Sequence, residues 1–426
     1  AAPRRHRRGQ AKLALNNRIP SPESNKKMNR NLAIFTAFAL FCHGSYAQAD
    51  FLKDSSATLT TRNFSLNRDF RQSGAPQAKA EEWTQGFFAE LQSGYTEGTV
   101  GFGLDALGEL GIKLDSGRGR RGTALLPYGP DSNQPVDEYS ELGLTAKMRL
   151  SQTRLKVGTL MPIHPLAYYS DTRLLPSTFT GAYLTSSEVE NLTVTAARLT
   201  EANGRDSSSN DDISYAGQSS DHLDLLGGDY TLGKNLTLRY HQGELQDIYR
   251  QHFSGVIHVL PLGEGMCLRS DLRYVDSSDT GAAKAGKIDN RNFNGMFTLT
   301  VGAQRFAAAF QHLSGDSVFP VIDTGTPYVA NLVTYNSFTK ANEKSWQLRY
   351  EYDFAALGIP GLTFMTRYVK GSDIRTRTVN DGSEWERDTD LTYVFQSGAL
   401  EGLNLRWRNV TYRSGDGLTQ QLVENR

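Results

Sequence analysis

The sequence predicts an all-β protein, a transmembrane antiparallel β-barrel that encloses a polar lumen. Three observations predict it. Apolar and polar residues alternate over strand-length segments, an export signal lies near the N-terminus, and no later apolar run approaches the roughly 20 residues of a spanning helix. At roughly 20 residues per strand and connection, the chain after residue 49 suits a single domain of about 16 to 18 strands, which leaves an aqueous channel.

The export signal comes first along the chain. Met28 and Arg30 precede an apolar run at residues 32–41, and the small-residue pattern Ala47-Gln-Ala49 follows. We assign residues 28–49 as a signal peptide cleaved after Ala49. The alternative is a membrane-spanning helix, which needs roughly twice this apolar length. Residues 1–27 precede a suitable initiator methionine and lack apolar periodicity, so we assign them as a non-native upstream extension.

Charge excludes a nucleic-acid partner. The chain has 46 basic and 46 acidic residues, but residues 1–49 hold nine of the basic ones and one acidic residue. The remainder is therefore acidic by eight charges, whereas neutralising nucleic-acid phosphates requires a basic surface.

The alternation is clearest at residues 344–354, where Trp346 and Tyr350 share one face and Ser, Gln, Arg, Glu and Asp share the other. Segments 100–106, 236–241 and 297–301 alternate likewise. A soluble β-sandwich is the alternative. It would not need outward faces so rich in aromatic residues, which suit the interface of a membrane barrel.

Turn-rich stretches separate the strands and suit extracellular loops. They are residues 115–122, 203–212, 276–281 and 320–342. The acidic run at 206–212 invites a Ca²⁺ site, but it lacks the fixed spacing of a known calcium loop, so we expect a solvated hydrophilic loop and no metal.

One stretch, residues 161–181, breaks the strand pattern. It contains three prolines and a dense apolar content between two strand-like segments, 154–158 and 192–196. An exposed loop would not need so many apolar residues. We therefore expect this loop to fold inward, pack on the barrel wall and narrow the pore, with Arg173 near the constriction.

Motifs for enzymes are weak. Gly101-Phe-Gly103-Leu-Asp-Ala106 matches a dinucleotide fingerprint, but alternation continues through it and no helix pattern follows, so a strand with small lumen-facing residues is the better interpretation. The sequence has no nucleophile elbow and no paired-histidine zinc motif. We predict neither catalysis nor a cofactor.

Several further motifs resemble one family, the OprD-type substrate-selective channels of the pseudomonad outer membrane, over nearly all of the mature chain. They are Arg62-Asn-Phe-Ser-Leu-Asn-Arg68, Glu82-Trp-Thr-Gln-Gly86, Gly94-Tyr-Thr-Glu-Gly-Thr-Val-Gly-Phe-Gly-Leu-Asp105, Asp247-Ile-Tyr-Arg250, Lys344-Ser-Trp-Gln347, Gly358-Ile-Pro-Gly-Leu-Thr-Phe-Met365 and Gln396-Ser-Gly398. The resemblance implies an 18-stranded barrel with a narrow constriction that takes up small carboxylates by diffusion. The 161–181 stretch looks like the family's constriction loop.

The family lines its pore with a ladder of basic residues. The resemblance places this ladder at Arg68, Arg173, Arg406, Arg408 and Arg426. It adds Lys79, although the spacing from Lys79 to Trp83 departs from the family's pattern. Guanidinium groups suit this task, because they replace the hydration of a carboxylate with bidentate hydrogen bonds and never deprotonate.

Alternation supports part of this ladder independently. Leu405 and Trp407 share one face, so Arg406 and Arg408 share the other and point into the lumen if the apolar face meets lipid. The alternative is that each arginine merely pairs with a lumen acid such as Glu351 or Asp353.

Three function classes remain open: a selective carboxylate channel, a general diffusion porin, and an outer-membrane enzyme, which the missing catalytic constellation disfavours. Within the family, some members favour basic amino acids or peptides. The stretch 334–338, which includes the expected solute-binding residue Tyr335, carries Ser337 where the resemblance implies an acid in such members. This favours aromatic or aliphatic monocarboxylates. We expect a monomer or weak trimer in contact with outer-membrane lipid and lipopolysaccharide.

The C-terminus departs from the family pattern. The chain ends at Leu422-Val-Glu-Asn-Arg426, where the resemblance implies that a last strand begins. We therefore expect the barrel to lack roughly ten residues of that strand and to leave a gap beside residues 58–66.

Overall fold

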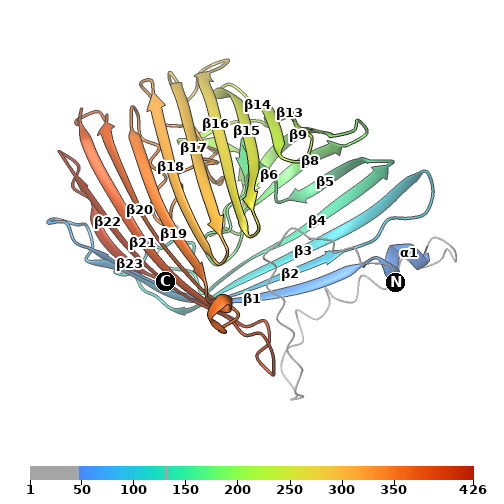
Figure 1. The fold of residues 1–426 in the computed structure, drawn as a ribbon, viewed down its shortest axis with the longest axis horizontal. Helices are drawn as coiled ribbons and strands as arrows, with labels where there is room; N and C mark the ends of the chain where they lie inside the picture. Colours follow the sequence, from blue (N-terminus) through green and yellow to red (C-terminus); the bar gives the residue numbers. More distant parts are fainter. Residues whose placement is uncertain (1–47, 130–132) are drawn as a thin grey trace.

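A single closed sheet of eighteen antiparallel strands makes up the computed structural model, which describes residues 48–129 and 133–426 (Figure 1). The strands are β1 (Ser56–Phe70), β2 (Lys79–Gln92), β3 (Val100–Asp115), β4 (Glu138–Leu150), β5 (Thr153–Leu160), β8 (Thr178–Ser186), β9 (Leu192–Asn203), β13 (Leu223–Leu232), β14 (Leu236–Leu245), β15 (Tyr249–Gly263), β16 (Met266–Asp279), β17 (Asp289–Val301), β18 (Gln304–Ser314), β19 (Lys344–Asp353), β20 (Leu362–Ile374), β21 (Gly382–Val394), β22 (Asn404–Gly415) and β23 (Gln421–Asn425). The predicted fold class is confirmed.

Short elements lie between these strands. They are α1 (Gln48–Lys53), β6 (Ile163–His164), β7 (Ala167–Tyr168), β10 (Asn210–Asp212), β11 (Ser214–Tyr215), β12 (Gln218–Ser219) and the 3-10 turn η2 (Phe354–Leu357). No helix in the described ranges is long and apolar enough to cross a membrane. The predicted upstream extension and all but the last two residues of the predicted signal peptide fall outside the described residues.

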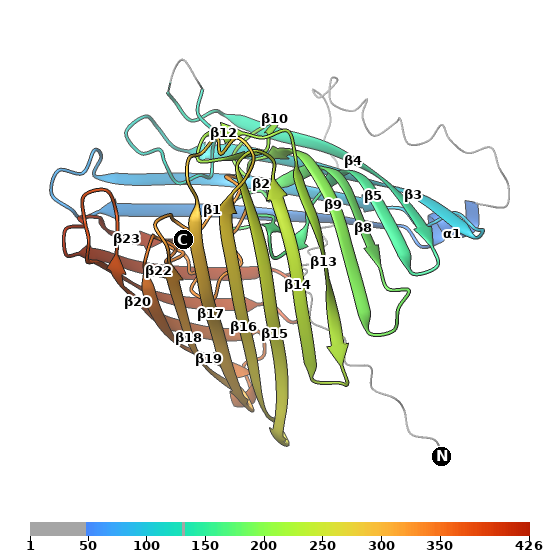
Figure 2. The same ribbon diagram turned by 90° about the horizontal axis from the view of Figure 1, so that it is seen from above.

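The barrel closes where its first and last strands meet. Each long strand pairs with the next along the chain, and β23 pairs with both β22 and β1, so the two ends of the chain's colour gradient lie side by side in Figures 1 and 2. The β1–β23 register joins Asn67 to Asn425 and Phe70 to Leu422. Within the described residues, the rest of β1 pairs with β2 alone. That the last strand lacks a further portion stays a prediction.

The two faces of the wall differ as the alternation predicts. In β19, Trp346 and Leu348 are exposed on the outside, whereas Ser345 and Gln347 are buried on the lumen side. An apolar outer band meets lipid, and the closed ladder satisfies the backbone amides.

The two ends of the barrel differ in their connections. One end has tight links such as residues 151–152, 264–265 and 302–303, and the other has long links such as 116–137, 161–177 and 315–343. We call these the short-turn end and the long-loop end. In outer-membrane barrels, short turns face the periplasm and longer loops face the exterior.

Two long loops enter the barrel. The inner loop (residues 161–177) lies against opposite parts of the wall: a Cβ on Gly86 of β2 would lie 3.0 Å from Leu174, and one on Gly243 of β14 would lie 3.1 Å from Leu166. The second loop (residues 315–343) is hydrogen-bonded to it, for example from Thr326 N to Tyr168 O at 2.8 Å. The inner loop therefore spans the lumen and narrows it, as predicted.

An apolar cluster fixes these loops inside the barrel. Members of the inner loop (Leu166, Ala167) and of the second loop (Phe319, Ile322, Val329) pack with lumen-facing strand residues such as Leu225 and Phe253. Burial of this cluster explains the dense apolar content of the inner loop.

Three expected loops are shorter than predicted. Residues 276–279 continue β16, residues 178–181 begin β8, and residues 210–212 form β10 against β9. The strands extend beyond the apolar core of the membrane as a hydrogen-bonded rim, where polar residues such as Asp276 and Ser277 are tolerated on both faces.

Candidate functional site: an arginine track in the lumen

A buried carboxylate, Glu424 of β23, binds two of the predicted arginines. Arg68 of β1 donates from Nε to Glu424 Oε2 at 2.7 Å, and Arg426 donates from Nε to Glu424 Oε1. Both guanidinium groups are almost fully buried. Arg68 also donates to Gly122 O at 3.2 Å, and Arg426 to Thr334 O at 2.9 Å. The junction of the first and last strands thus carries an Arg–Glu–Arg cluster.

Tyr335 of the second loop lies on this cluster. The guanidinium of Arg68 lies over the Tyr335 ring, 5.0 Å from its centroid, and the Tyr412 ring of β22 packs against Tyr335 at 5.1 Å. The backbone N–H of Tyr335 donates to Glu386 at 2.8 Å. The second loop therefore fixes the position of an aromatic ring beside the arginines.

Arg173 of the inner loop lies close to the same group. Its Nε donates to Thr123 O at 2.8 Å and its Nη1 to Thr172 O at 2.9 Å. Within the described residues it has no ion pair with a carboxylate. Burial, together with the neighbouring Arg426 and Arg205, lowers the pKa of Arg173 from its ordinary value. The loop thus holds a cation whose charge is poorly compensated.

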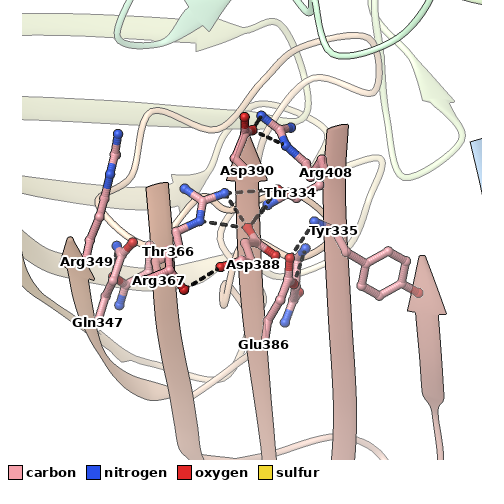
Figure 3. A network of polar contacts seen from close by, with 12 residues as sticks. Thr334, Tyr335, Gln347, Arg349, Thr366, Arg367, Glu386, Asp388, Asp390 and Arg408 are labelled. Carbon is pink, nitrogen blue, oxygen red and sulfur yellow. Dashed lines mark hydrogen bonds and ion pairs between the residues drawn. The ribbon is translucent and has the colours of Figure 1, made fainter. Parts of the chain in front are cut away.

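Arg406 and Arg408 of β22 form a second group around Asp390 of β21. Arg406 donates from Nε and Nη2 to Asp390 Oδ2 at 2.9 and 2.6 Å. Arg408 donates from Nε to the same oxygen at 2.8 Å (Figure 3). Both side chains are on the lumen face, opposite the exposed Leu405 and Trp407. An acid partner was anticipated, but Glu351 and Asp353 were the wrong candidates.

A row of acids on β21 was missed by the sequence analysis. Glu384, Glu386, Asp388 and Asp390 recur every second residue and are all buried on the lumen face. Lys340 pairs with Glu384. Arg367 pairs with Asp388 at 2.7 Å (Figure 3). Four carboxylates with period two on one strand are a readable sequence pattern, and these acids hold the basic residues and the second loop in place.

Lys79 does not join these groups. It is the first residue of β2, pairs with Glu81, and shares the parity of the outward-facing Trp83, whereas Ala80 and Glu82 face the lumen. Alternation therefore places Lys79 on the outer face, and its assignment to the ladder is corrected.

The opposite part of the wall carries a second polar group that the sequence analysis also missed. Tyr328 of the second loop accepts a hydrogen bond from Arg239 Nη1 at 3.1 Å, and Arg273 lies 4.0 Å from its ring centroid. Asp229 and Asp271 pair with these two arginines.

Two histidines connect the inner loop to this wall. His164 Nε2 lies 3.0 Å from His241 Nδ1, and His241 Nε2 lies 2.8 Å from Asp229 Oδ1. Both histidines are buried. Within the described residues, no group of three or more His, Cys, Asp or Glu residues is arranged to hold a metal ion.

Comparison with known proteins identifies the family. A family model described as "outer membrane porin, OprD family" matches residues 49–426. The porin-like protein GalP of Pseudomonas putida is 40% identical over 381 residues, which cover 88% of this chain and 91% of GalP.

Two solved structures from Pseudomonas aeruginosa agree. OccK9 (OpdG) is 43% identical with a TM-score of 0.85, covering 88% of this chain and 97% of that one. OpdK solved with vanillate is 37% identical with a TM-score of 0.83, covering 88% and 98%. Such porins are channels rather than enzymes and lie in the outer membrane. The chain belongs to the OprD family of outer membrane porins.

Proposed function

We propose that this porin is a substrate-selective channel for passive uptake of small carboxylates, guided through the lumen by Arg68, Arg173, Arg406, Arg408 and Arg426, with Tyr335 beside them. The observation that carries the proposal is the pair of arginine clusters around Glu424 and Asp390. In each cluster, a carboxylate of the wall orients two guanidinium groups that project from neighbouring strands or the chain end.

The contacts that orient Arg406 and Arg408 leave other N–H donors of these residues for a solute. A guanidinium has five N–H donors, and the Asp390 contacts use Nε and Nη2 of Arg406 and Arg408. The Arg406 side chain remains 53% exposed, so its other terminal nitrogen is free to bind a passing carboxylate. Charge-assisted hydrogen bonds of this kind replace the water that the solute loses at the constriction.

Arg173 adds attraction for a solute carboxylate at the constriction of the pore. Its charge has no ion-pair partner among the described residues, and burial, followed by the neighbouring Arg426 and Arg205, lowers its pKa. A solute carboxylate next to Arg173 would relieve this repulsion. Several moderate sites in succession let a solute move on, whereas one tight site would trap it.

The aromatic ring of Tyr335 beside Arg68 favours carboxylates that carry an apolar body. One relative, OpdK, was solved with vanillate, which is an aromatic carboxylate. Both observations support monocarboxylates, aromatic or aliphatic, as the solute class.

Two other channel functions are less well supported. A member that takes basic amino acids needs free acids in the lumen, but Lys340, Arg367 and backbone N–H groups occupy those of β21. A general diffusion porin needs a wide pore, and the inner loop crosses this one.

Replacement of Arg406 and Arg408 by Gln tests the proposal. Loss of the charge-assisted contact that this pair makes with a passing carboxylate, worth about 1.5 kcal/mol, should lower benzoate uptake into proteoliposomes roughly tenfold. The matched control is Arg198→Gln with Arg250→Gln, which removes two outward-facing arginines that pair with Asp224 and Glu244. Benzoate flux equal to that of the parent in a correctly folded R406Q/R408Q variant would contradict the proposed track.

We further propose how the protein is exported and assembled. A leader at residues 28–49 is cleaved after Ala49, and the mature barrel is a monomer or weak trimer. Mass spectrometry of the outer-membrane form would check the cleavage, with a mature N-terminus at Asp50 as the expected result.

A further inference from the structure

A cavity separate from the constriction lies in the lumen at the short-turn end. Its volume is about 410 Å³, and its lining includes the β2–β3 turn at residues 93–98 and the β4–β5 hairpin. Four basic residues of that hairpin line it: Lys147, Arg149, Arg154 and Lys156. None of the proposed constriction residues belongs to this lining.

The register of the hairpin sets cation opposite cation. Lys147 lies directly opposite Lys156, and on the next rung of the same face Arg149 lies directly opposite Arg154. Like charges opposite each other destabilise an antiparallel pair. A barrel that keeps two such rungs side by side concentrates positive charge at that position, at a cost to its own stability.

Counter-charge at this site is partial: three carboxylates, those of Asp54, Glu97 and Asp105, line the cavity beside its four basic residues, and among the described residues only Asp105 forms an ion pair. Asp105 of β3 lies 2.5 Å from Lys147 Nζ and 3.9 Å from Lys156 Nζ. Arg149 lies over the Tyr95 ring at 4.7 Å, and among the described residues neither Arg149 nor Arg154 forms an ion pair. The constriction differs, because Glu424 and Asp390 there each bind two arginines.

The shape of the cavity depends on a glycine. A Cβ on Gly103 would lie 2.4 Å from Lys147 Cε and 2.7 Å from Gly94 O, closer than real contacts allow. Gly103 thus lets the 93–98 turn fold into the lumen over β3 and brings Tyr95 between Lys147 and Arg149. The repeat of small residues at Gly101 and Gly103 serves this close approach.

We infer that this basic hairpin is a second anion-binding site, which holds a small carboxylate at the short-turn end after it leaves the constriction. The inference rests on the proposed function for the identity of the solute, but the charge arrangement stands independently. Rings of Lys and Arg attract anions into pores, and an anion at this site would offset the repulsion of both rungs.

Single-channel recording tests the inference. Sodium benzoate is added to the short-turn side of one barrel in a planar bilayer with potassium chloride, and the concentration that halves the chloride current is measured. The test variant is Arg149→Gln with Arg154→Gln, which keeps the Lys147–Asp105 ion pair. Loss of the two unpaired charges should raise the half-blocking concentration about threefold or more.

Two further variants keep the result interpretable. R198Q/R250Q removes the same charge from the outer face and should leave block unchanged. Asp105→Asn removes the carboxylate that partners Lys147 and should act oppositely, lowering the half-blocking concentration. Heat-modifiable mobility confirms folding of each variant.

An unchanged half-blocking concentration in folded R149Q/R154Q overturns the inference. Stronger block by inorganic phosphate than by benzoate in the parent would overturn the assignment to carboxylates. Failure of the proposed function has a different outcome, since it appears as equal benzoate uptake by the parent and R406Q/R408Q.

Discussion

The constriction and the β4–β5 hairpin use the same basic residue types in opposite ways. At the constriction, Glu424 and Asp390 each bind two guanidinium groups, so the arginines are fixed in direction and each pair shares one negative charge. At the hairpin, cations face cations across two rungs, and Asp105 forms ion pairs with Lys147 and Lys156. Oriented donors and uncompensated charge are therefore separate means of attracting an anion.

Shortening the inner loop should have the largest effect, because it breaks the constriction and spares the hairpin. Replacing residues 165–175 by a short Gly-Ser link removes Leu166 and Leu174, which reach the two sides of the wall. We expect single-channel conductance to rise severalfold and carboxylate preference to fall. Conductance equal to the parent's would mean that this loop does not limit the pore.

Removing the shared carboxylate should destabilise the barrel more at the Glu424 cluster than at the Asp390 cluster. Glu424→Gln leaves Arg68 and Arg426 buried without a carboxylate partner and should cost about 3 kcal/mol of unfolding free energy. Asp390→Asn should cost less, about 1 kcal/mol, because Arg406 remains half exposed to water. Urea unfolding in detergent micelles measures both. A larger loss for D390N than for E424Q would contradict the ranking.

Gly103→Ala should weaken anion binding at the β4–β5 hairpin and largely spare the constriction. The added Cβ must displace Lys147 or the 93–98 turn, so benzoate block from the short-turn side should weaken about twofold while uptake through the constriction falls less. Gly108→Ala is the matched control, since a Cβ there meets nothing within 4 Å. Identical block in the two variants would show that the close approach at Gly103 is not needed.

The smallest expected effect is a pH dependence of the inner loop. Burial, with His241 and Arg239 nearby, lowers the pKa of His164 from 6.5 to about 3. Between pH 6.5 and about 3, His164 would bind a proton when the loop is released from the wall but not when it is docked. Docking of the loop therefore weakens as the pH falls below about 6.5. The charged side chains beside it are Arg239 and Asp229, and the His241 ring contacts it.

Current noise from loop opening should therefore increase between pH 6.5 and pH 4, and His164→Gln should remove most of this dependence. If the variant kept the full pH dependence, the titrating group would lie elsewhere, for example among the lumen carboxylates.

Alternation predicted which side chains face outward and which face the lumen, but not which lumen residues pair with each other. The outward Trp407 and the lumen-facing Arg406 follow from period two alone, and so does the outward position of Lys79, which shares the parity of Trp83. The family pattern placed Lys79 wrongly because it ignored that parity.

The partners of the arginines could not be predicted in the same way. Arg68 and Glu424 are 356 residues apart and meet because the barrel closes, and Asp390 meets Arg408 through the β21–β22 register. Register and closure depend on the whole sheet, not on a local pattern. The acids of β21 were nevertheless visible as a period-two row.

Selectivity for carboxylates is tested most directly with two solutes of similar size and opposite charge. Proteoliposomes that contain the parent channel are loaded in parallel with benzoate and with benzylammonium, and both initial fluxes are measured. If oriented lumen arginines select carboxylates, benzoate flux should exceed benzylammonium flux about tenfold or more. Equal fluxes would mean that the barrel selects by size alone, and faster entry of the cation would mean that the lumen arginines do not set its selectivity.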